Sequence, residues 1–263
     1  YVLNVPTAAT DNVFRTAIGK NKSTPVTFKE VNWNQTVADF DKSVTAEGTE
    51  FARIEDGEFD SNNPNVFYFL TTESNKDLIA TAPNPATPTV TRDGGGLWRL
   101  TFKDAQNPLL GAELELLLNG GENIYMSKPD NMAITKNGVI MIQEDPGNND
   151  HVARVVAYRI KDAKLATVAA FSSEHFAKGA TKPITLDEES SGIIDVTSMM
   201  AKKGDTNTYF LLNAQVHTTG VIPARPDLAK RSEATKTKLN NVAVEGGQFY
   251  LMTVSDWNSV FSS

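Results

Sequence analysis

The chain has 263 residues, a formal net charge of −7 and an isoelectric point near 5.1. Its acidic balance argues against nucleic acid as a partner, because phosphate binding needs a basic surface. The sequence has no apolar run of about 18 residues, so it predicts no transmembrane helix. Cysteine is absent, which excludes disulfides and thiolate metal ligands within the chain.

The first 50 residues predict strands and one short helix. Residues 1–5 are strand-like, and segments 13–18 and 24–33 are predicted to pair as extended chain across a polar turn. Three apolar residues spaced three and four apart predict a helix over 34–44.

From residue 51 onward, three units each open on carboxylates and end in a strongly apolar strand. Glu55 opens the first unit, Asp130 the second, and Glu188 with Glu189 the third. The second unit has an Asn-Gly turn between two apolar runs, which is a strong hairpin signal. The first predicted strand begins at 55–56. The later predicted strands are 66–70, 97–102, 113–118, 132–135, 139–142, 152–160, 165–171, 192–196, 208–212 and 249–254.

Many short strands with almost no helix predict an all-β fold, and four-stranded units predict a β-propeller. A β-sandwich is the alternative, although it leaves the recurring carboxylates unexplained. Between the second and third strands, a long loop with three prolines over 80–88 is typical of a functional or mobile segment.

In a propeller the first strand of each blade lines the central channel, so carboxylates at equivalent strand starts converge at one end of that channel. Carboxylates and amide oxygens are the ligands that Ca²⁺ prefers. The predicted ligands are Glu55, Asp130, Glu144, Asp145, Glu188 and Glu189, with further oxygens from Asn131, Gln143 and Asn148. The alternative is that these carboxylates flank strands because exposed strand ends favour charge.

Two basic side chains are candidate catalytic residues. Arg53 lies two residues before Glu55, so both point to one face, and we expect an ion pair in preference to a phosphate contact. His217 ends a predicted strand, where it is either structural or close to the site. No role is assigned to His151 or His175.

Several motifs together resemble a known family. They are Arg-Ile-Glu-Asp-Gly at 53–57, Asn-Pro-Asn-Val-Phe-Tyr-Phe at 63–69, Leu-Trp-Arg-Leu at 97–100, Asp-Asn at 130–131, Gln-Glu-Asp-Pro-Gly-Asn-Asn at 143–149, Glu-Glu-Ser-Ser-Gly-Ile-Ile-Asp-Val at 188–196 and Glu-Gly-Gly-Gln at 245–248. Over residues 51–254 the chain resembles the bacterial PhoX-like alkaline phosphatases, once a family of unknown function.

The resemblance implies a six-bladed propeller, export from the cytoplasm and hydrolysis of phosphate monoesters. It also implies a Ca²⁺-rich site at one end of the channel, which in characterised members holds Fe³⁺ as well. This chain departs from the family by having no cysteine to bind iron. Ca²⁺ is therefore the expected cofactor, whereas Fe³⁺ would lack the family's cysteine ligand within this chain.

The resemblance also bears on domain organisation and partners. Residues 1–50 are expected to form part of a blade, and residues 51–263 to form the propeller blades of the PhoX-like domain. Three units are half of six blades, so an N-terminal remainder of the same precursor or another protein chain is expected to complete the ring. The first residue, a tyrosine and not a methionine, predicts a segment upstream.

Two functions remain open. The first is a metal-dependent phosphoesterase whose Ca²⁺ polarises the phosphoryl oxygens. The second is a non-catalytic surface or assembly protein that keeps the propeller and structural Ca²⁺. Either protein would be exported to the periplasm, the cell surface or the medium.

Overall fold

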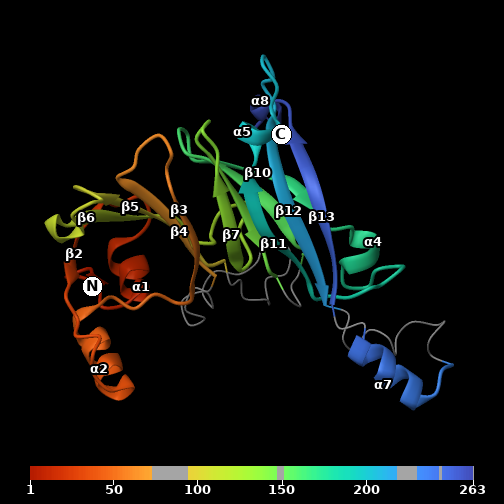
Figure 1. Cartoon of the computed structure of the whole chain (residues 1–263), viewed down its shortest axis with the longest axis horizontal. Coiled ribbons are helices and arrows are strands. Elements are labelled where there is room, and N and C mark those ends of the chain that lie inside the picture. The colour runs from red at the N-terminus through yellow and green to blue at the C-terminus, as the bar shows by residue number, and fades with distance from the viewer. Residues whose placement is uncertain (73–93, 147–150, 218–229, 243–244, 263) are drawn as a thin grey trace. The chain divides into compact units, whose positions relative to one another are not determined.

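The computed structural model describes residues 1–72, 94–146, 151–217, 230–242 and 245–262 (Figure 1). The chain divides into two compact units, Tyr1–Pro129 and Asp130–Ser263, called unit 1 and unit 2 below. The predicted proline-rich loop over 80–88 and Asn148 lie outside the described residues. The predicted domains, residues 1–50 and 51–263, are assigned by their expected places in propeller blades. That assignment stays a prediction.

Unit 1 is built on one antiparallel sheet with the strand order β1-β2-β6-β5-β4-β3. Its strands are β1 (Val2–Asn4), β2 (Thr24–Lys29), β3 (Ile54–Phe59), β4 (Val66–Thr71), β5 (Gly96–Phe102) and β6 (Ala112–Leu118). Its helical segments are α1 (Asp11–Val13), the π-helix η1 (Phe14–Ile18), α2 (Val37–Glu47) and η2 (Pro108–Leu110). The first two predicted strands of the first unit are confirmed as β3 and β4, which pair antiparallel.

The prediction that segments 13–18 and 24–33 pair as strands is wrong. Residues 11–18 are helical, and β2 pairs instead with β1 and β6. Phe14 and Ile18 are four residues apart, a spacing that puts both on one helical face. Phe14 is fully buried there, with its ring centroid 5.2 Å from that of Trp98.

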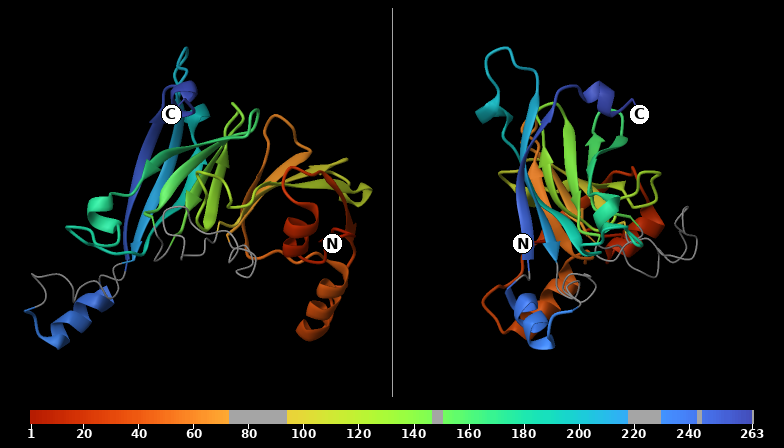
Figure 2. Two further views of the ribbon diagram at one scale, coloured as in Figure 1. Left: turned by 180° about the vertical axis from the view of Figure 1, so that it is seen from behind. Right: turned by 90° about the vertical axis from the view of Figure 1, so that its right-hand side faces the viewer.

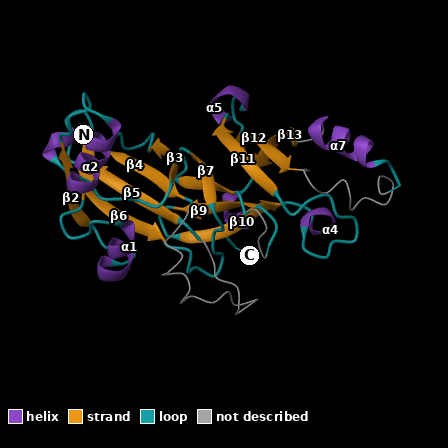
Figure 3. Cartoon of the chain, turned by 90° about the horizontal axis from the view of Figure 1, so that it is seen from below, coloured by secondary structure: helices purple, strands orange, loops and turns teal. Residues whose placement is uncertain are grey.

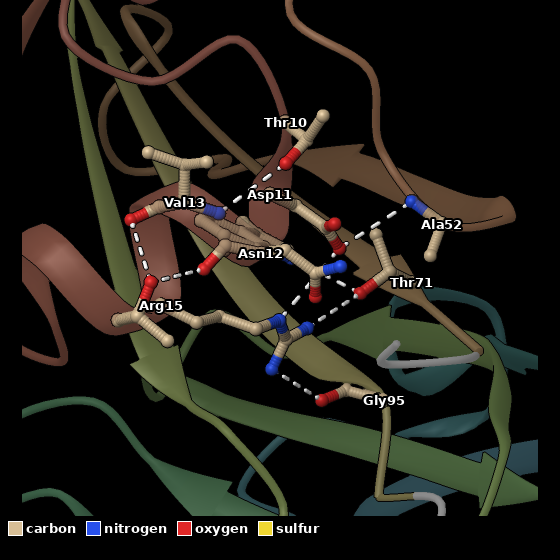
Figure 4. A network of polar contacts seen from close by, with 10 residues as sticks. Thr10, Asp11, Asn12, Val13, Arg15, Ala52, Thr71 and Gly95 are labelled. Atoms are coloured by element: carbon tan, nitrogen blue, oxygen red, sulfur yellow. Dashed lines mark hydrogen bonds and ion pairs between the residues drawn. The ribbon is translucent and has the colours of Figure 1, made fainter. Parts of the chain in front are cut away.

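A buried polar network fastens this helical segment to the sheet (Figure 4). Arg15 donates to the carbonyl of Gly95 at 3.0 Å and to Thr71 Oγ1 at 3.3 Å, and its Nε lies 3.6 Å from Asp11 Oδ2. Burial raises the pKa of Asp11, and the charge of Arg15 only partly offsets this effect. Because these contacts join the helix to β4 and β5, the network is a structural support of unit 1.

Two glycines hold the start of β5 against a neighbouring turn. A Cβ atom on Gly94 would lie 2.3 Å from the Cα of Gly120, and one on Gly120 would lie 2.6 Å from the Cα of Gly94. Neither contact is possible for a real side chain, so both positions require glycine. Directly after β4, the Thr72 N–H donates to the carbonyl of Arg53, the residue before β3, at 3.0 Å.

Unit 2 contains two antiparallel sheets with the strand orders β10-β9-β8-β7 and β11-β12-β13 (Figure 2). The strands are β7 (Pro129–Ile134), β8 (Val139–Glu144), β9 (Arg154–Arg159), β10 (Lys164–Ala170), β11 (Glu188–Asp195), β12 (Thr208–His217) and β13 (Glu245–Val254). Its helices are α4 (Ser173–Phe176), α5 (Thr197–Met200), α7 (Glu233–Val242) and α8 (Trp257–Val260). One apolar core joins both sheets, with Met141 and Val155 from the first and Phe210 from the second.

Strands dominate the described chain, as Figure 3 shows, and the prediction of an all-β fold is confirmed. The antiparallel sheets, each curled, are consistent with part of a propeller. No closed barrel is formed by the strands of the described residues. Among the described helices, none has the length and apolar character needed to cross a bilayer.

We expect Trp98→Ala to destabilise unit 1 by about 3–5 kcal/mol, the usual cost of emptying a buried aromatic site. Trp98 is 0% exposed and its indole ring lies among Phe14, Phe51 and Phe69. Urea unfolding followed by circular dichroism measures the change. Trp33→Ala is the matched control, because Trp33 is 82% exposed. Equal unfolding midpoints for the two variants would contradict the assignment of the core.

Candidate functional site

The polar residues of unit 2 gather where β8 ends and where β9 and β11 begin. Glu144, the last residue of β8, is fully buried. Arg154 donates to its carboxylate from the backbone N–H at 3.0 Å, from Nε at 2.9 Å and from Nη2 at 2.8 Å. His151 Nε2 lies 3.2 Å from Glu144 Oε2. Both carboxylate oxygens therefore have cationic or N–H partners.

These contacts decide the protonation state of Glu144. Burial by itself would raise the pKa of this carboxyl group. The hydrogen bond with His151 and the bonds and charge of Arg154 outweigh that effect and hold the pKa below its usual value. Glu144 is thus an ionised carboxylate inside the protein.

Glu188, the first residue of β11, has the opposite electrostatic environment. Its side chain is buried, and its Oε1 accepts a hydrogen bond from the Ala153 N–H at 2.9 Å. Burial raises the pKa of Glu188, and the hydrogen bond from Ala153 only partly offsets it. His151 and Glu188 also line the same small pocket. Two neighbouring carboxyl groups with pKa values displaced in opposite directions are a common arrangement for acid–base chemistry.

A larger cavity of about 710 Å³ opens beside this cluster. Its walls are mainly apolar side chains of β9, β10, α4, β12 and β13, while Arg154 and Ser190 contribute polar groups. Behind Ser190, the buried Gln143 donates from Nε2 to Ser190 Oγ at 2.5 Å, and Gln143 Oε1 has no hydrogen-bond partner among the residues that the structure describes. The cavity therefore has one polar end and a long apolar wall.

A second pair of a carboxylate and a histidine lies where β11 begins and β12 ends. His217 Nε2 lies 3.5 Å from Glu189 Oε2, and both side chains are partly exposed. Since Glu188 and Glu189 are adjacent in β11, alternation points their side chains to opposite faces of the sheet.

Comparison with known proteins places these residues in a family. A family model described as "Alkaline phosphatase PhoX" matches residues 7–215. The chain belongs to the PhoX alkaline phosphatase family. No curated protein and no solved structure matches the chain. The PhoX match spans parts of both units and includes Glu144, Arg154 and Glu188, whereas His217 lies two residues beyond its end.

The predicted ligands of the PhoX-type Ca²⁺ site are distributed over both units. Glu55 belongs to unit 1, whereas Asp130, Glu144, Asp145, Glu188 and Glu189 belong to unit 2. The convergence of Glu55 with Asp130 and Glu144 stays a prediction. Asn131, another predicted oxygen ligand, accepts a hydrogen bond from the Gly192 N–H at 2.9 Å and so holds β7 against β11.

Ca²⁺ does not fit the arrangement around Glu144 in this structure. Among the described residues, no group of three or more His, Asp or Glu side chains is placed to hold a metal ion. Arg154 already uses both oxygens of Glu144, and its guanidinium would repel a divalent cation at hydrogen-bond distance. A cation at Glu144 would require the Arg154 side chain to move.

In unit 1, Arg53 forms the predicted ion pair with Glu55. Its Nη2 lies 3.5 Å from Glu55 Oε1, and the Arg53 side chain is 58% exposed. Arg53 has a φ of 53°, a left-handed conformation that is uncommon for a residue other than glycine. Strain of this kind is often found at functional positions.

Sequence reasoning missed His151, Arg154 and Ser190. His151 and Arg154 follow directly after an oxygen-rich loop and precede a strand of buried apolar residues. An arginine at that boundary is a signal that a buried carboxylate needs a counter-charge nearby. Neither spacing nor alternation identifies Glu144 as that carboxylate.

We expect Glu144→Gln to destabilise unit 2 at pH 7 by about 3–5 kcal/mol, because it leaves the largely buried charge of Arg154 uncompensated. The pKa of Glu144 is lowered by folding, so its contribution to stability is present above the unfolded value of 4.5 and is lost as pH falls through the folded value. The difference between variant and wild type should therefore shrink in acid. Urea unfolding followed by circular dichroism at pH 7 and at pH 4 measures it.

Glu174→Gln is the control for this experiment, because Glu174 pairs with Lys182 at 2.7 Å while 47% exposed. A surface ion pair of this kind contributes about 0–1 kcal/mol. An equal effect of the two substitutions, or no pH dependence at Glu144, would contradict the assignment.

Glu188→Gln should show the opposite pH dependence. The pKa of Glu188 is raised by burial, so its favourable contribution is present below 4.5 and is lost as pH rises through the folded value. Relative to the wild type, the Glu188→Gln variant should therefore have a higher free energy of unfolding at pH 7 than at pH 4. The same unfolding measurements test this, and a pH slope of the same sign as that of Glu144→Gln would refute it.

Proposed function

We propose that the chain acts in the hydrolysis of phosphate monoesters, as a PhoX-type alkaline phosphatase. The observation that carries this proposal is the family match over residues 7–215. The polar cluster of unit 2 supports it, because it combines a partly exposed guanidinium, an imidazole and two carboxyl groups, and the guanidinium of Arg154 lines the large cavity.

In this proposal Arg154 binds the phosphoryl group. Its side chain is 17% exposed and lines the large cavity, while Glu144 fixes its guanidinium plane. Arginine recognises phosphate through paired charge-assisted hydrogen bonds. Negative charge that develops on the phosphoryl oxygens would then be stabilised from a fixed position, with little reorganisation during the reaction.

His151 is the proposed proton-transfer group. Its side chain is 19% exposed, and the fully buried Glu144 orients the ring by a contact at Nε2. An imidazole oriented by a carboxylate can take a proton from water or give one to a leaving oxygen. Glu188, with its raised pKa, lies in the same small pocket and is a second proton donor in this proposal.

Dependence on Ca²⁺ is a separate part of the proposal, supported by the family resemblance and by the acidic residues at the strand starts. Because the described arrangement of Glu144 does not fit the ion, no step above involves it. Elemental analysis and calorimetric melting with and without a chelator test whether Ca²⁺ binds. An unchanged melting temperature together with no bound Ca²⁺ would remove this part.

A non-catalytic surface or assembly protein is the second candidate function. The observation that favours it is the ion pair between Glu144 and Arg154, which satisfies both groups without any ligand. Family membership supports export for either candidate, because PhoX alkaline phosphatases are typically exported proteins.

We expect the purified chain to hydrolyse p-nitrophenyl phosphate when assayed with and without added Ca²⁺ and Fe³⁺. Arg154→Ala should lower kcat/KM by about 10²–10³, the usual effect of removing a fixed donor to developing charge. His151→Ala should lower kcat and flatten its pH dependence. Arg154→Lys retains the charge, and circular dichroism verifies that each variant is folded.

His175→Ala is the control for the histidine variant. His175 Nδ1 lies 2.9 Å from the Lys182 carbonyl, and its partly exposed side chain forms no hydrogen bond or ion pair with Glu144, Arg154 or Glu188 and lines neither pocket of the described chain. Its replacement should leave turnover unchanged. Absence of turnover in the folded, metal-supplemented wild type would favour the non-catalytic candidate.

A further inference from the structure

We propose that the large cavity of unit 2 binds the organic group of the substrate and selects phosphate monoesters whose alcohol is large and apolar, such as a long alkyl chain. This inference rests on the proposed phosphatase activity and adds the identity of the leaving group. Hydrolysis of such an ester breaks the bond between phosphorus and the ester oxygen. Water adds its oxygen to phosphorus, and one of its protons ends on the released alcohol.

The first observation is the size and lining of the cavity. Its volume of about 710 Å³ is in the range of sites that enclose a whole small molecule, and a phosphate group alone would fill only a small part of it. Phe171 and Phe176 line it with their rings edge to face, 5.0 Å between centroids. Tyr250 lines it too, and because its hydroxyl donates to Gln248 Oε1, its polar atom is already satisfied. Most of the space is therefore suited to an apolar group.

The second observation is a buried hydroxyl group in the cavity wall that lacks an acceptor. Ser190 lines the cavity and is only 3% exposed. Its Oγ accepts a hydrogen bond from Gln143 Nε2 at 2.5 Å, which leaves the Ser190 O–H free to donate. Among the residues that the structure describes, none provides an acceptor for this O–H. A buried donor without an acceptor is costly, so the group indicates an acceptor on a ligand, such as a phosphate oxygen.

The third observation is that the cavity adjoins the groups proposed to act on the phosphate. Arg154 lines the large cavity, His151 lines the small pocket, and both contact the carboxylate of Glu144. Phe176 lines the cavity and the pocket alike. A phosphoryl group held by Arg154 and Ser190 would thus leave its alcohol to extend along the apolar wall.

Burial of the alcohol determines how strongly the cavity discriminates between esters. Each methylene group that is removed from water favours binding by about fourfold. The hydroxyl groups of glycerol or a sugar would instead lose hydrogen bonds to water without finding partners on an apolar wall. The cavity should therefore favour an alkyl ester over a polyhydroxy ester of the same size.

Steady-state hydrolysis of butyl, hexyl and octyl phosphate, each kept below its micellar concentration, tests the proposal. The three leaving alcohols are chemically alike, so only the apolar area of the substrate changes. We expect kcat/KM to rise about two- to fourfold for each added CH₂ group, and glycerol phosphate to be a poor substrate. Equal kcat/KM along the series would overturn the proposal and leave the proposed phosphatase activity in place.

Ala169→Leu tests whether the cavity causes this preference. Ala169 lines the cavity from β10, so a larger side chain there takes up volume that the alkyl chain would use. The ratio of kcat/KM for octyl phosphate to that for butyl phosphate should fall about tenfold or more. Thr167→Leu is the matched control, because Thr167 lies on the same strand, is exposed and is not among the described residues that line the cavity. A wild-type ratio in both variants would overturn the proposal.

Ser190→Ala tests the polar end of the cavity. Because every ester in the series has the same phosphate group, kcat/KM should fall for all of them alike, by about tenfold or more, as for the loss of a hydrogen bond to a charged group. Circular dichroism verifies that the variant is folded. An unchanged kcat/KM would overturn the placement of the phosphate beside Ser190.

Binding measurements separate a failure of this inference from a failure of the proposed function. If the folded, metal-supplemented protein hydrolyses none of these esters, the proposed function fails. Isothermal titration calorimetry with butylphosphonate and octylphosphonate, which have no ester bond to cleave, then tests the cavity alone. Tighter binding of octylphosphonate would support a site for apolar phosphate-like ligands. Equal affinities, or no binding, would overturn the inference and leave the cavity as a contact surface for another protein chain.

Discussion

A carboxylate without solvent contact is tolerated only where other groups neutralise and hydrogen-bond it, and Glu144 imposes this requirement on unit 2. Its partners, His151 and Arg154, come from beyond residues 147–150, so the two ends of that segment are held together by charge. The same contacts place Ala153, whose N–H reaches Glu188 on β11. One buried charge thus determines where β9 begins and how the two sheets meet at that end.

The cavity beside this cluster follows from the same arrangement. Away from the cavity, Met141 and Phe210 fill the space between the sheets. Around the cavity, Ala153, Ala169 and Ala214 are among the lining side chains, and the space stays open. Polar groups that must keep their own partners cannot close it, because packing against apolar walls would cost their hydrogen bonds. The polar cluster and the unfilled volume beside it therefore share one cause.

Much of the strand framework could be predicted from the sequence, because each strand has a local signature. The Asn-Gly turn marked the hairpin of β7 and β8, and the apolar run 66–70 marked β4. The helical segment 11–18 could not be predicted, since its stability comes from Phe14 packing on Trp98 and from Arg15 reaching Gly95, both distant in sequence. Carboxylates at strand starts were visible as a pattern. The pairing of Arg154 with Glu144 depends on a tertiary contact and could not be predicted from that pattern.

The paired glycines of unit 1 have a practical consequence for engineering. Thr72 is tied to Arg53, and Gly94 lies against Gly120, so the chain positions on either side of residues 73–93 are fixed independently of what joins them. The entropic cost of closing a loop grows only slowly with its length. An epitope, a fluorescent label or a small reporter domain could therefore be inserted between Thr72 and Gly94. A substitution at Gly94 or Gly120 would disrupt their close contact and with it one of the two anchors.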